Sequence, residues 1–190
     1  MEKRIPPFIQ ETKNKYENKS IEVWFQDETR FGQKGRLTKI WAETNTRPIK
    51  INQNEHKSAY LFGAVNPITG NSHGLIVSTV STDLMNLFLA QISKKMSRWK
   101  HCVLIVDGAG WHRSDDILVP KNITLLPLPP YSPELNCIER LWNWIKDNYL
   151  SLKVFPNEDA IYEAGCLAWQ HATPEIIRSV CHTPWLLSSY

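Results

Sequence analysis

Residues 126–142 read LPLPPYSPELNCIERLW, and this stretch decides how the chain folds. A strand-like apolar run over 123–126 leads into it. Its prolines then fix φ and withhold backbone N–H donors, so neither a strand nor a helix can continue. We expect a helix to restart with Asn136 as the N-cap and Glu139 completing a capping box. Apolar residues then recur at helical spacing, at Ile138, Leu141, Trp142, Ile145 and Tyr149.

This turn delivers the Glu139 carboxylate to a position fixed by the strand before it. Such a carboxylate is either a helix cap or a ligand, and the rest of the chain has to decide which. Glu134, five residues earlier, is the competing acidic residue, and its place in the turn favours stabilisation of the helix dipole.

The composition indicates one globular domain. The chain has 190 residues, of which 42% are hydrophobic and 22% charged, enough to bury a substantial core. A net charge of +3 permits a nucleic-acid partner without requiring one. The four cysteines form no C-x-x-C pair, which argues against a zinc finger or a disulfide framework. No signal peptide and no run of roughly 18 apolar residues is present, so we expect a cytoplasmic protein without a membrane partner.

The first half of the chain predicts strands close together in sequence. Residues 1–20 form a lead-in segment, either a short helix or extended. A strand over 21–26 then ends on Asp27, and further strands are expected at 40–43, 58–65 and 74–77. Neighbours this close along the chain should pair as antiparallel hairpins.

The second half alternates helices with buried strands. Ser81 or Thr82 can cap a helix whose inner face would hold Leu84, Leu87, Phe88, Gln91 and Ile92. The apolar run 101–106 reads as a central strand that ends on Asp107, and a crossover leads to a parallel strand over 123–126. Two outer helices are expected at about 158–169 and 174–187.

This order of elements, β-β-β(-β)-α-β-α-β-α, outlines an α/β fold of the ribonuclease-H-like type, a mixed central sheet flanked by helices. Asp27, Asp107 and Glu139 would then meet at one edge of the sheet. Carboxylate oxygens are the ligands that Mg²⁺ prefers, and a pair of such ions supports phosphodiester cleavage. Three carboxylates in one pocket repel one another, so without metal the site should have raised pKa values or be partly disordered.

Three blocks of sequence carry a family resemblance. Residues 24–32, 106–114 and 128–142 resemble the signature blocks of the DDE transposases of the IS630/Tc1-mariner superfamily, in particular the IS630 type. The resemblance implies a ribonuclease-H-like catalytic domain over 21–190. It implies that Asp27, Asp107 and Glu139 bind two Mg²⁺ ions, with Mn²⁺ able to substitute.

The implied activity is cleavage of DNA strands at transposon ends, followed by attack of the freed 3′-hydroxyl on target DNA. The implied partners are DNA and further copies of the chain assembled on it. Family members carry N-terminal helix-turn-helix domains that the 20-residue lead-in is too short to form. We therefore expect that domain to be encoded separately or fused by a frameshift, in a prokaryotic cell. Cys137 departs from the family pattern, which usually has proline there.

Each site residue also has a structural interpretation. Asp27 could begin a turn, Asp107 could cap or shape the glycine turn after it, and Glu139 could be a cap alone. Glu28, next to Asp27, reads as a solvated or supporting residue on the opposite face of the strand. At the level of the whole protein, the alternatives are an inactive transposase relic or DNA-binding accessory, and a ribonuclease-H-like nuclease.

Other residues are candidates for contact with DNA. The basic side chains could line a phosphate groove, and an indole next to Asp107 could stack on a base. Of the eight tryptophans, Trp24, Trp142 and Trp169 are expected to pack in the core. The predicted DNA-binding residues are Trp111, His112, Arg113, Arg140 and Lys146.

Overall fold

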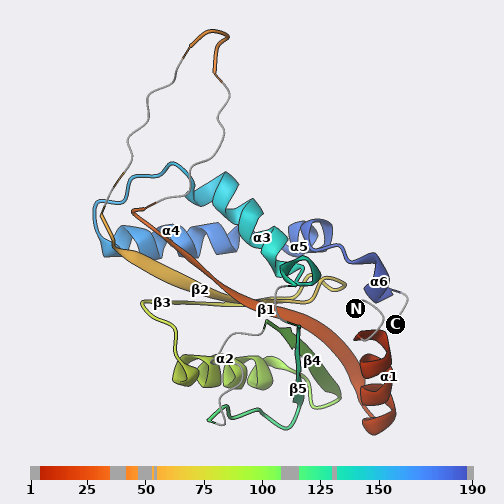
Figure 1. Cartoon of the computed structure of the whole chain (residues 1–190). Helices are drawn as coiled ribbons and strands as arrows, with labels where there is room; N and C mark the ends of the chain where they lie inside the picture. The colour runs from red at the N-terminus through yellow and green to blue at the C-terminus, as the bar shows by residue number, and fades with distance from the viewer. Residues whose placement is uncertain are drawn as a thin grey trace.

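Figure 1 shows a central sheet with helices on both faces. The structure is a computed structural model that describes residues 5–34, 42–46, 53, 55–107, 116–129 and 132–187. Within them the sheet has five strands in the order β3-β2-β1-β4-β5. The strands are β1 (Ser20–Gly32), β2 (Ser58–Val65), β3 (Ser72–Val77), β4 (Lys100–Val106) and β5 (Ile123–Pro127). The helices are α1 (Ile5–Lys15), α2 (Thr82–Lys95), α3 (Ile138–Ile145), α4 (Glu158–Gln170), α5 (Pro174–Val180) and α6 (Pro184–Leu187).

Strand β1 is the centre of the sheet because it pairs on both sides. Its first half runs parallel to β4, with Ser20 opposite Lys100 and Phe25 opposite Ile105. Its second half runs antiparallel to β2 as far as Gly32. The hairpin of β2 and β3 and the parallel pair of β4 and β5 complete the sheet. The predicted mixed sheet is therefore confirmed.

Two apolar layers cover the faces of the sheet. Alternate residues of β1 and β4 point to opposite faces, as the period of a strand requires. One layer packs under α2 and the other under α3, α4 and α5. Members of the α2 layer are Trp24, Phe62, Phe88 and Leu104, and members of the other are Val23, Phe25, Val103, Ile105, Ile138 and Trp142.

The predicted end of the first strand is wrong. β1 continues through Asp27 to Gly32, because its polar residues after Gln26 keep backbone pairing with β2. The strand predicted at 40–43 falls partly on residues 40 and 41, which lie outside the described residues. Ala42 and Glu43 belong to no strand, and Thr46 N–H instead donates to Glu43 O in a turn.

Helix α2 begins as predicted, since the Ser81 hydroxyl accepts a hydrogen bond from Leu84 N–H. Its buried face is rotated from the predicted one. Leu87 is 47% exposed, because the residues that pack on the sheet sit one position later in the helical pattern. The buried residues are Met85, Phe88, Leu89 and Ile92.

The crossover from β4 to β5 joins parallel strands, as predicted. Its described part, residues 116–122, contains no helix, and residues 108–115 lie outside the description. At the N-terminus the lead-in forms a helix, α1, which buries Ile5 and Ile9. The last predicted helix is in fact two, α5 and α6, because Cys181 ends the first of them and Pro184 begins the second. No helix in the described ranges is long and apolar enough to cross a membrane.

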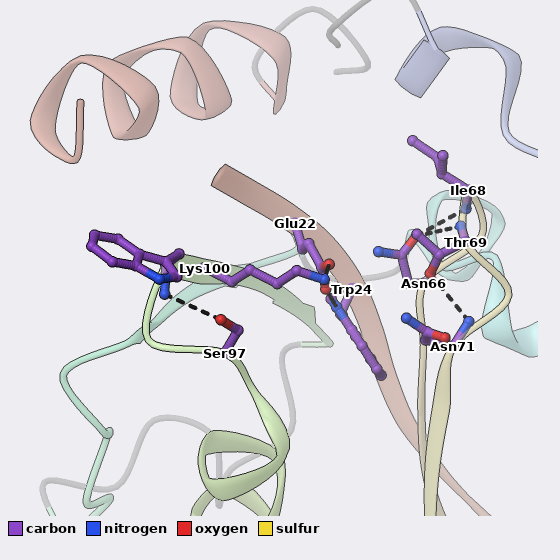
Figure 2. A network of polar contacts seen from close by, with 9 residues as sticks. Glu22, Trp24, Asn66, Ile68, Thr69, Asn71, Ser97 and Lys100 are labelled. Carbon is purple, nitrogen blue, oxygen red and sulfur yellow. Dashed lines mark hydrogen bonds and ion pairs between the residues drawn. The ribbon is translucent and has the colours of Figure 1, made fainter. Parts of the chain in front are cut away.

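Side-chain hydrogen bonds fix the end of the sheet away from Asp27 (Figure 2). Glu22 accepts a bond from the Trp24 indole at 3.0 Å and forms an ion pair with Lys100 of β4. In the turn between β2 and β3, Asn66 Oδ1 accepts from the backbone N–H groups of Ile68 and Thr69. These bonds satisfy the buried side chains of Glu22 and Asn66.

His101 connects α1 to the sheet as a neutral side chain. It is fully buried on β4, stacks on Tyr16 with ring centroids 3.8 Å apart, and its Nε2 lies 2.8 Å from Thr124 Oγ1. Burial, helped by the nearby charges of Lys19 and Lys15, lowers the pKa of His101 to about 4. Protonation of the buried ring is therefore unfavourable in the fold.

Acidification should destabilise the protein through His101. Between the unfolded pKa of about 6.5 and the folded pKa of about 4, the unfolded chain binds the extra proton, so stability is lost as the pH falls through this window. His101→Phe keeps a ring to stack on Tyr16 but cannot titrate. We expect the free energy of unfolding of this variant, measured in urea, to fall by about 1 kcal/mol less than that of wild type between neutral and mildly acid pH. Equal losses in the two proteins would contradict the assignment.

Candidate active site

Asp27 lies in the middle of β1 with its side chain under α3. The residue is only 6% exposed. The indole N–H of Trp142, on α3, donates a hydrogen bond to Asp27 Oδ2 at 2.9 Å. A buried carboxylate is costly unless it is hydrogen-bonded, so this bond both stabilises Asp27 and fixes its direction. The helix and the central strand are thus joined at the candidate site.

Glycines in the sheet make room for this arrangement. Gly63 of β2 is paired with Asp27, and a Cβ added there would lie 2.4 Å from Trp142 Cη2. Gly74 of β3 is paired with Gly63, and a Cβ there would lie 2.5 Å from the ring of Trp169. The two indoles are adjacent, with centroids 5.9 Å apart. Side chains at either glycine would lift an indole off the sheet, so the glycines let Trp142 reach Asp27.

Asp107 lies at the same edge and on the same face of the sheet as Asp27. Phe25 and Ile105 are the last paired residues of the parallel strands β1 and β4. Asp27 and Asp107 each follow two positions later, so they continue in register and point to the side that α3 covers. The backbone pairing brings Asp27 and Asp107 to the same end of the parallel pair, and their joint role in a site stays a prediction.

Glu139 lies in the first turn of α3, but the predicted capping box is wrong. The N-cap is Cys137, and no side chain caps the helix. The Asn136 side chain is instead buried, and its Nδ2 donates to the backbone carbonyl of Gln26 in β1 at 3.0 Å. The Asn136 side chain therefore bonds to the Gln26 carbonyl of the sheet and does not cap the helix. This bond holds the start of α3, and with it Glu139, beside Asp27.

The negative charges of neighbouring carboxylates act on Asp27. Burial, followed by the negative charges of Glu139, Glu28 and Asp107, raises the pKa of Asp27 to about 8, although a backbone hydrogen bond from Glu28 opposes the shift. The raised pKa expected of clustered carboxylates is thus found at Asp27. It shows that Glu139 and Asp107 lie close enough for their charges to act on this residue.

The three carboxylates do not lie close enough together to form a complete metal site. Among the residues that the structure describes, no group of three acidic, histidine or cysteine side chains has the geometry to hold an ion. Mutual repulsion between carboxylates favours such a separation when no cation is bound. A divalent cation would offset their charges, and hard carboxylate oxygens are the donors that Mg²⁺ and Mn²⁺ accept. The donor set therefore fits such an ion.

The predicted DNA contacts have mixed outcomes. Trp111, His112 and Arg113 lie outside the described residues. Arg140 donates to the carbonyls of Val180 and His182 at 2.9 and 2.7 Å, so it ties α3 to the segment between α5 and α6.

Lys146 begins a π-helical turn, η3 (Lys146–Leu150), that continues α3. For all five predicted contacts, from Trp111 to Lys146, DNA binding stays a prediction.

Sequence reasoning missed the role of Trp142. It placed this residue in the core, which is correct, because Trp142 is 1% exposed. The contact with Asp27 could have been sought from one signal: Trp142 follows Glu139 by three positions, so the two side chains are neighbours on the surface of α3. The matching glycines could not have been found, because they depend on strand register.

Comparisons with known proteins identify the family of this chain. A family described as DDE superfamily endonuclease matches residues 22–161. The uncharacterized protein y4pE/y4sA of Sinorhizobium fredii is 40% identical over 131 residues, which are 69% of this chain and 91% of that protein.

Among solved structures, the Mos1 mariner paired-end complex with Mn has a TM-score of 0.68 at 16% identity, over 96% of this chain and 58% of that one. The Mos1 strand transfer complex has a TM-score of 0.64 at 17% identity, over 98% of this chain and 58% of that one. These similarities show a common fold, the ribonuclease-H-like fold predicted from the order of elements. The chain spans a little over half the length of the Mos1 chains.

The fit of Trp142 over Gly63 gives a testable prediction. Gly63→Ala places a methyl group against the indole, so the ring or the strand must move. We expect a loss of about 1–3 kcal/mol in the free energy of unfolding, measured in urea. Trp142→Phe supplies the matched control, because a smaller ring leaves space for the methyl group. In a protein that already carries Trp142→Phe, the change Gly63→Ala should cost clearly less. Equal costs in both backgrounds would show that the indole does not need the glycine.

Proposed function

We propose, from the premise that this chain belongs to the DDE superfamily endonucleases, that it cuts and joins DNA strands with divalent metal ions held by Asp27, Asp107 and Glu139. The observation that carries the proposal is the buried Asp27 carboxyl, whose pKa is raised by burial and by the neighbouring carboxylates of Glu139, Glu28 and Asp107. A protein rarely retains such an unfavourable group unless function requires it. Divalent metal use is the usual property of this family, and the Mos1 complexes with Mg and Mn support it.

Each of the three carboxylates would have its own role in binding the metal ions. Asp27 would be the central ligand, because the charges of both Glu139 and Asp107 act on it and the Trp142 indole holds it through one oxygen. A carboxylate has further lone pairs, so this bond leaves coordination sites open. Asp107 and Glu139 would each complete one side of a site for two ions. When bound, the pair of ions would supply an activated nucleophile and stabilise the charge that develops on the phosphorus.

The chain's own part is to position these ligands and to limit water. Asn136 and Trp142 fix α3 against β1 at two points, so Glu139 can reach Asp27 without a rearrangement of the sheet. The apolar layer under α3 excludes solvent from the inner side of Asp27. In a site of low polarity, the interaction between the carboxylates and a cation is stronger than in water.

The substrate proposed is DNA at the ends of a transposon, followed by target DNA that the freed 3′-hydroxyl attacks. Support comes from the Mos1 structures, which are described as paired-end and strand transfer complexes. The chain spans about 58% of the Mos1 chain in the strand transfer complex. We propose that a helix-turn-helix domain recognises the transposon ends and that several copies act together on DNA. The Sinorhizobium relative supports a prokaryotic setting.

The test begins with metal binding, because this step needs only the catalytic core. We would titrate Mn²⁺ into wild type, Asp107→Asn and Glu134→Gln, following free Mn²⁺ by electron paramagnetic resonance and folding by circular dichroism. We expect Asp107→Asn to raise the dissociation constant at least about tenfold, since it removes a charged ligand. Glu134→Gln is the matched control: Glu134 is an exposed glutamate just before α3, and its loss should change nothing.

Three outcomes bear on the proposal. Weaker binding by folded Asp107→Asn alone, together with Mg²⁺-dependent nicking of duplex DNA that this variant lacks, would support it. Equal Mn²⁺ binding by all three proteins, or none by any, would reject the site as drawn and favour an inactive relic. Cleavage of RNA–DNA hybrid in preference to duplex DNA would favour a ribonuclease-H-like nuclease instead.

A further inference from the structure

Helix α2 carries an outer stripe of residues that points away from the sheet. The outer stripe consists of Asp83, Leu87, Ala90 and Lys94, which recur four, three and four positions apart. This spacing places them on one face of a helix, and the buried side chains of α2 lie on the opposite face. Leu87 is largely exposed, so an apolar side chain stands in water between two charged ones.

Apolar residues of the crossover from β4 to β5 extend this exposed surface. Leu118 is 72% exposed, and Val119 beside it is exposed as well. The Asn86 side chain holds them against α2, because its Nδ2 donates to Asp116 O at 3.1 Å and its Oδ1 accepts from Leu118 N–H at 2.8 Å. A group of exposed apolar side chains that is held in place is typical of a surface that another protein covers.

The order of residues in the outer stripe is self-complementary. Asp83 lies in the first turn of α2 and Lys94 in the last turn. Leu87 follows Asp83 by four positions, and Ala90 precedes Lys94 by four. When a second copy of α2 lies antiparallel against the first, Asp83 of each copy faces Lys94 of the other, and Leu87 faces Ala90. The small Ala90 side chain leaves room for the leucine, so the same contact forms twice about a two-fold axis.

The helix dipole explains only part of this pattern. A carboxylate near the start of a helix and an ammonium group near its end are favourable in any helix. The dipole does not account for the exposed apolar residues Leu87 and Leu118, which lie between and beside the charges. Neither Asp83 nor Lys94 has an opposite charge three or four positions away along α2. A second copy would supply that charge to both of them.

We propose that two copies of this chain associate through α2, with their outer stripes antiparallel about a two-fold axis. Helix α2 and α3 lie on opposite faces of the sheet (Figure 1). Because the candidate metal ligands lie on the α3 side, the two active sites of such a dimer face away from the interface. The inference goes beyond the proposed function, in which copies act together on DNA, because this contact requires neither metal nor DNA.

The experiment measures association in EDTA and without DNA, by sedimentation velocity at about 1 to 100 μM protein, a range suited to a small interface. We expect wild type to form dimers. Leu87→Lys should raise the dissociation constant at least about tenfold, because each dimer loses two apolar contacts. Leu167→Lys is the matched control, since Leu167 is 49% exposed on α4 and Leu87 is 47% exposed on α2. This control should keep the wild-type dissociation constant, and circular dichroism checks the folding of both variants.

Charge reversal tests the antiparallel arrangement. In Asp83→Lys alone or Lys94→Asp alone, like charges face each other at both ends of the helix pair. Association at low salt should therefore weaken about tenfold in each variant. An equimolar mixture of the two variants should associate about as well as wild type, because each introduced charge then faces an opposite charge on the other copy. Repaired folding cannot cause this rescue, since each chain keeps its own substitution.

Any of three results would overturn the interface. They are a monomeric wild type at about 100 μM, equal association by Leu87→Lys and wild type, and a mixture of charge variants that associates no better than each variant alone. Absence of the dimer in a protein whose Mn²⁺ binding is weakened by Asp107→Asn would refute this inference alone. A dimer that responds as expected in a protein that binds no Mn²⁺ would reject the proposed function and retain the interface.

Discussion

The hydrogen bond from the Trp142 indole to the Asp27 carboxylate is the contact on which the rest of the site depends. It joins the central strand to α3 at the one buried acidic residue of the described sheet edge. The indole can lie there because Gly63, the strand partner of Asp27, has no side chain. The same helix carries Glu139, so the bond that stabilises Asp27 also brings the second carboxylate near it.

The register of β1 and β4 positions Asp107 relative to Asp27. The pairing of β1 with β4 ends at Phe25 and Ile105, and Asp27 and Asp107 each follow that pair by two positions. The result is an edge of the sheet with an excess of negative charge and a carboxyl whose pKa is raised by its neighbours.

Local sequence was sufficient where the pattern was strong and the partner lay nearby. The strand 58–65, the Ser81 cap and the apolar run before Asp107 are found where the sequence predicts them. Prediction from local sequence failed where a contact with a residue distant in the chain determines the structure. β1 extends past Asp27 because β2 pairs with the polar residues there. Asn136 does not cap α3, because its side chain donates a hydrogen bond to a carbonyl of β1. The acidic residues of the site could be proposed from sequence, whereas their supports could not.

The central claim is that Asp27 is an unfavourably placed carboxyl that a divalent cation stabilises. Carbon NMR of its side-chain carboxyl, titrated with pH in the absence and presence of Mg²⁺, tests this directly. Without Mg²⁺ the resonance should titrate near pH 8, and with saturating Mg²⁺ its midpoint should fall by several units, because the cation favours the ionised form. An ordinary midpoint near 4 in both conditions would contradict the account.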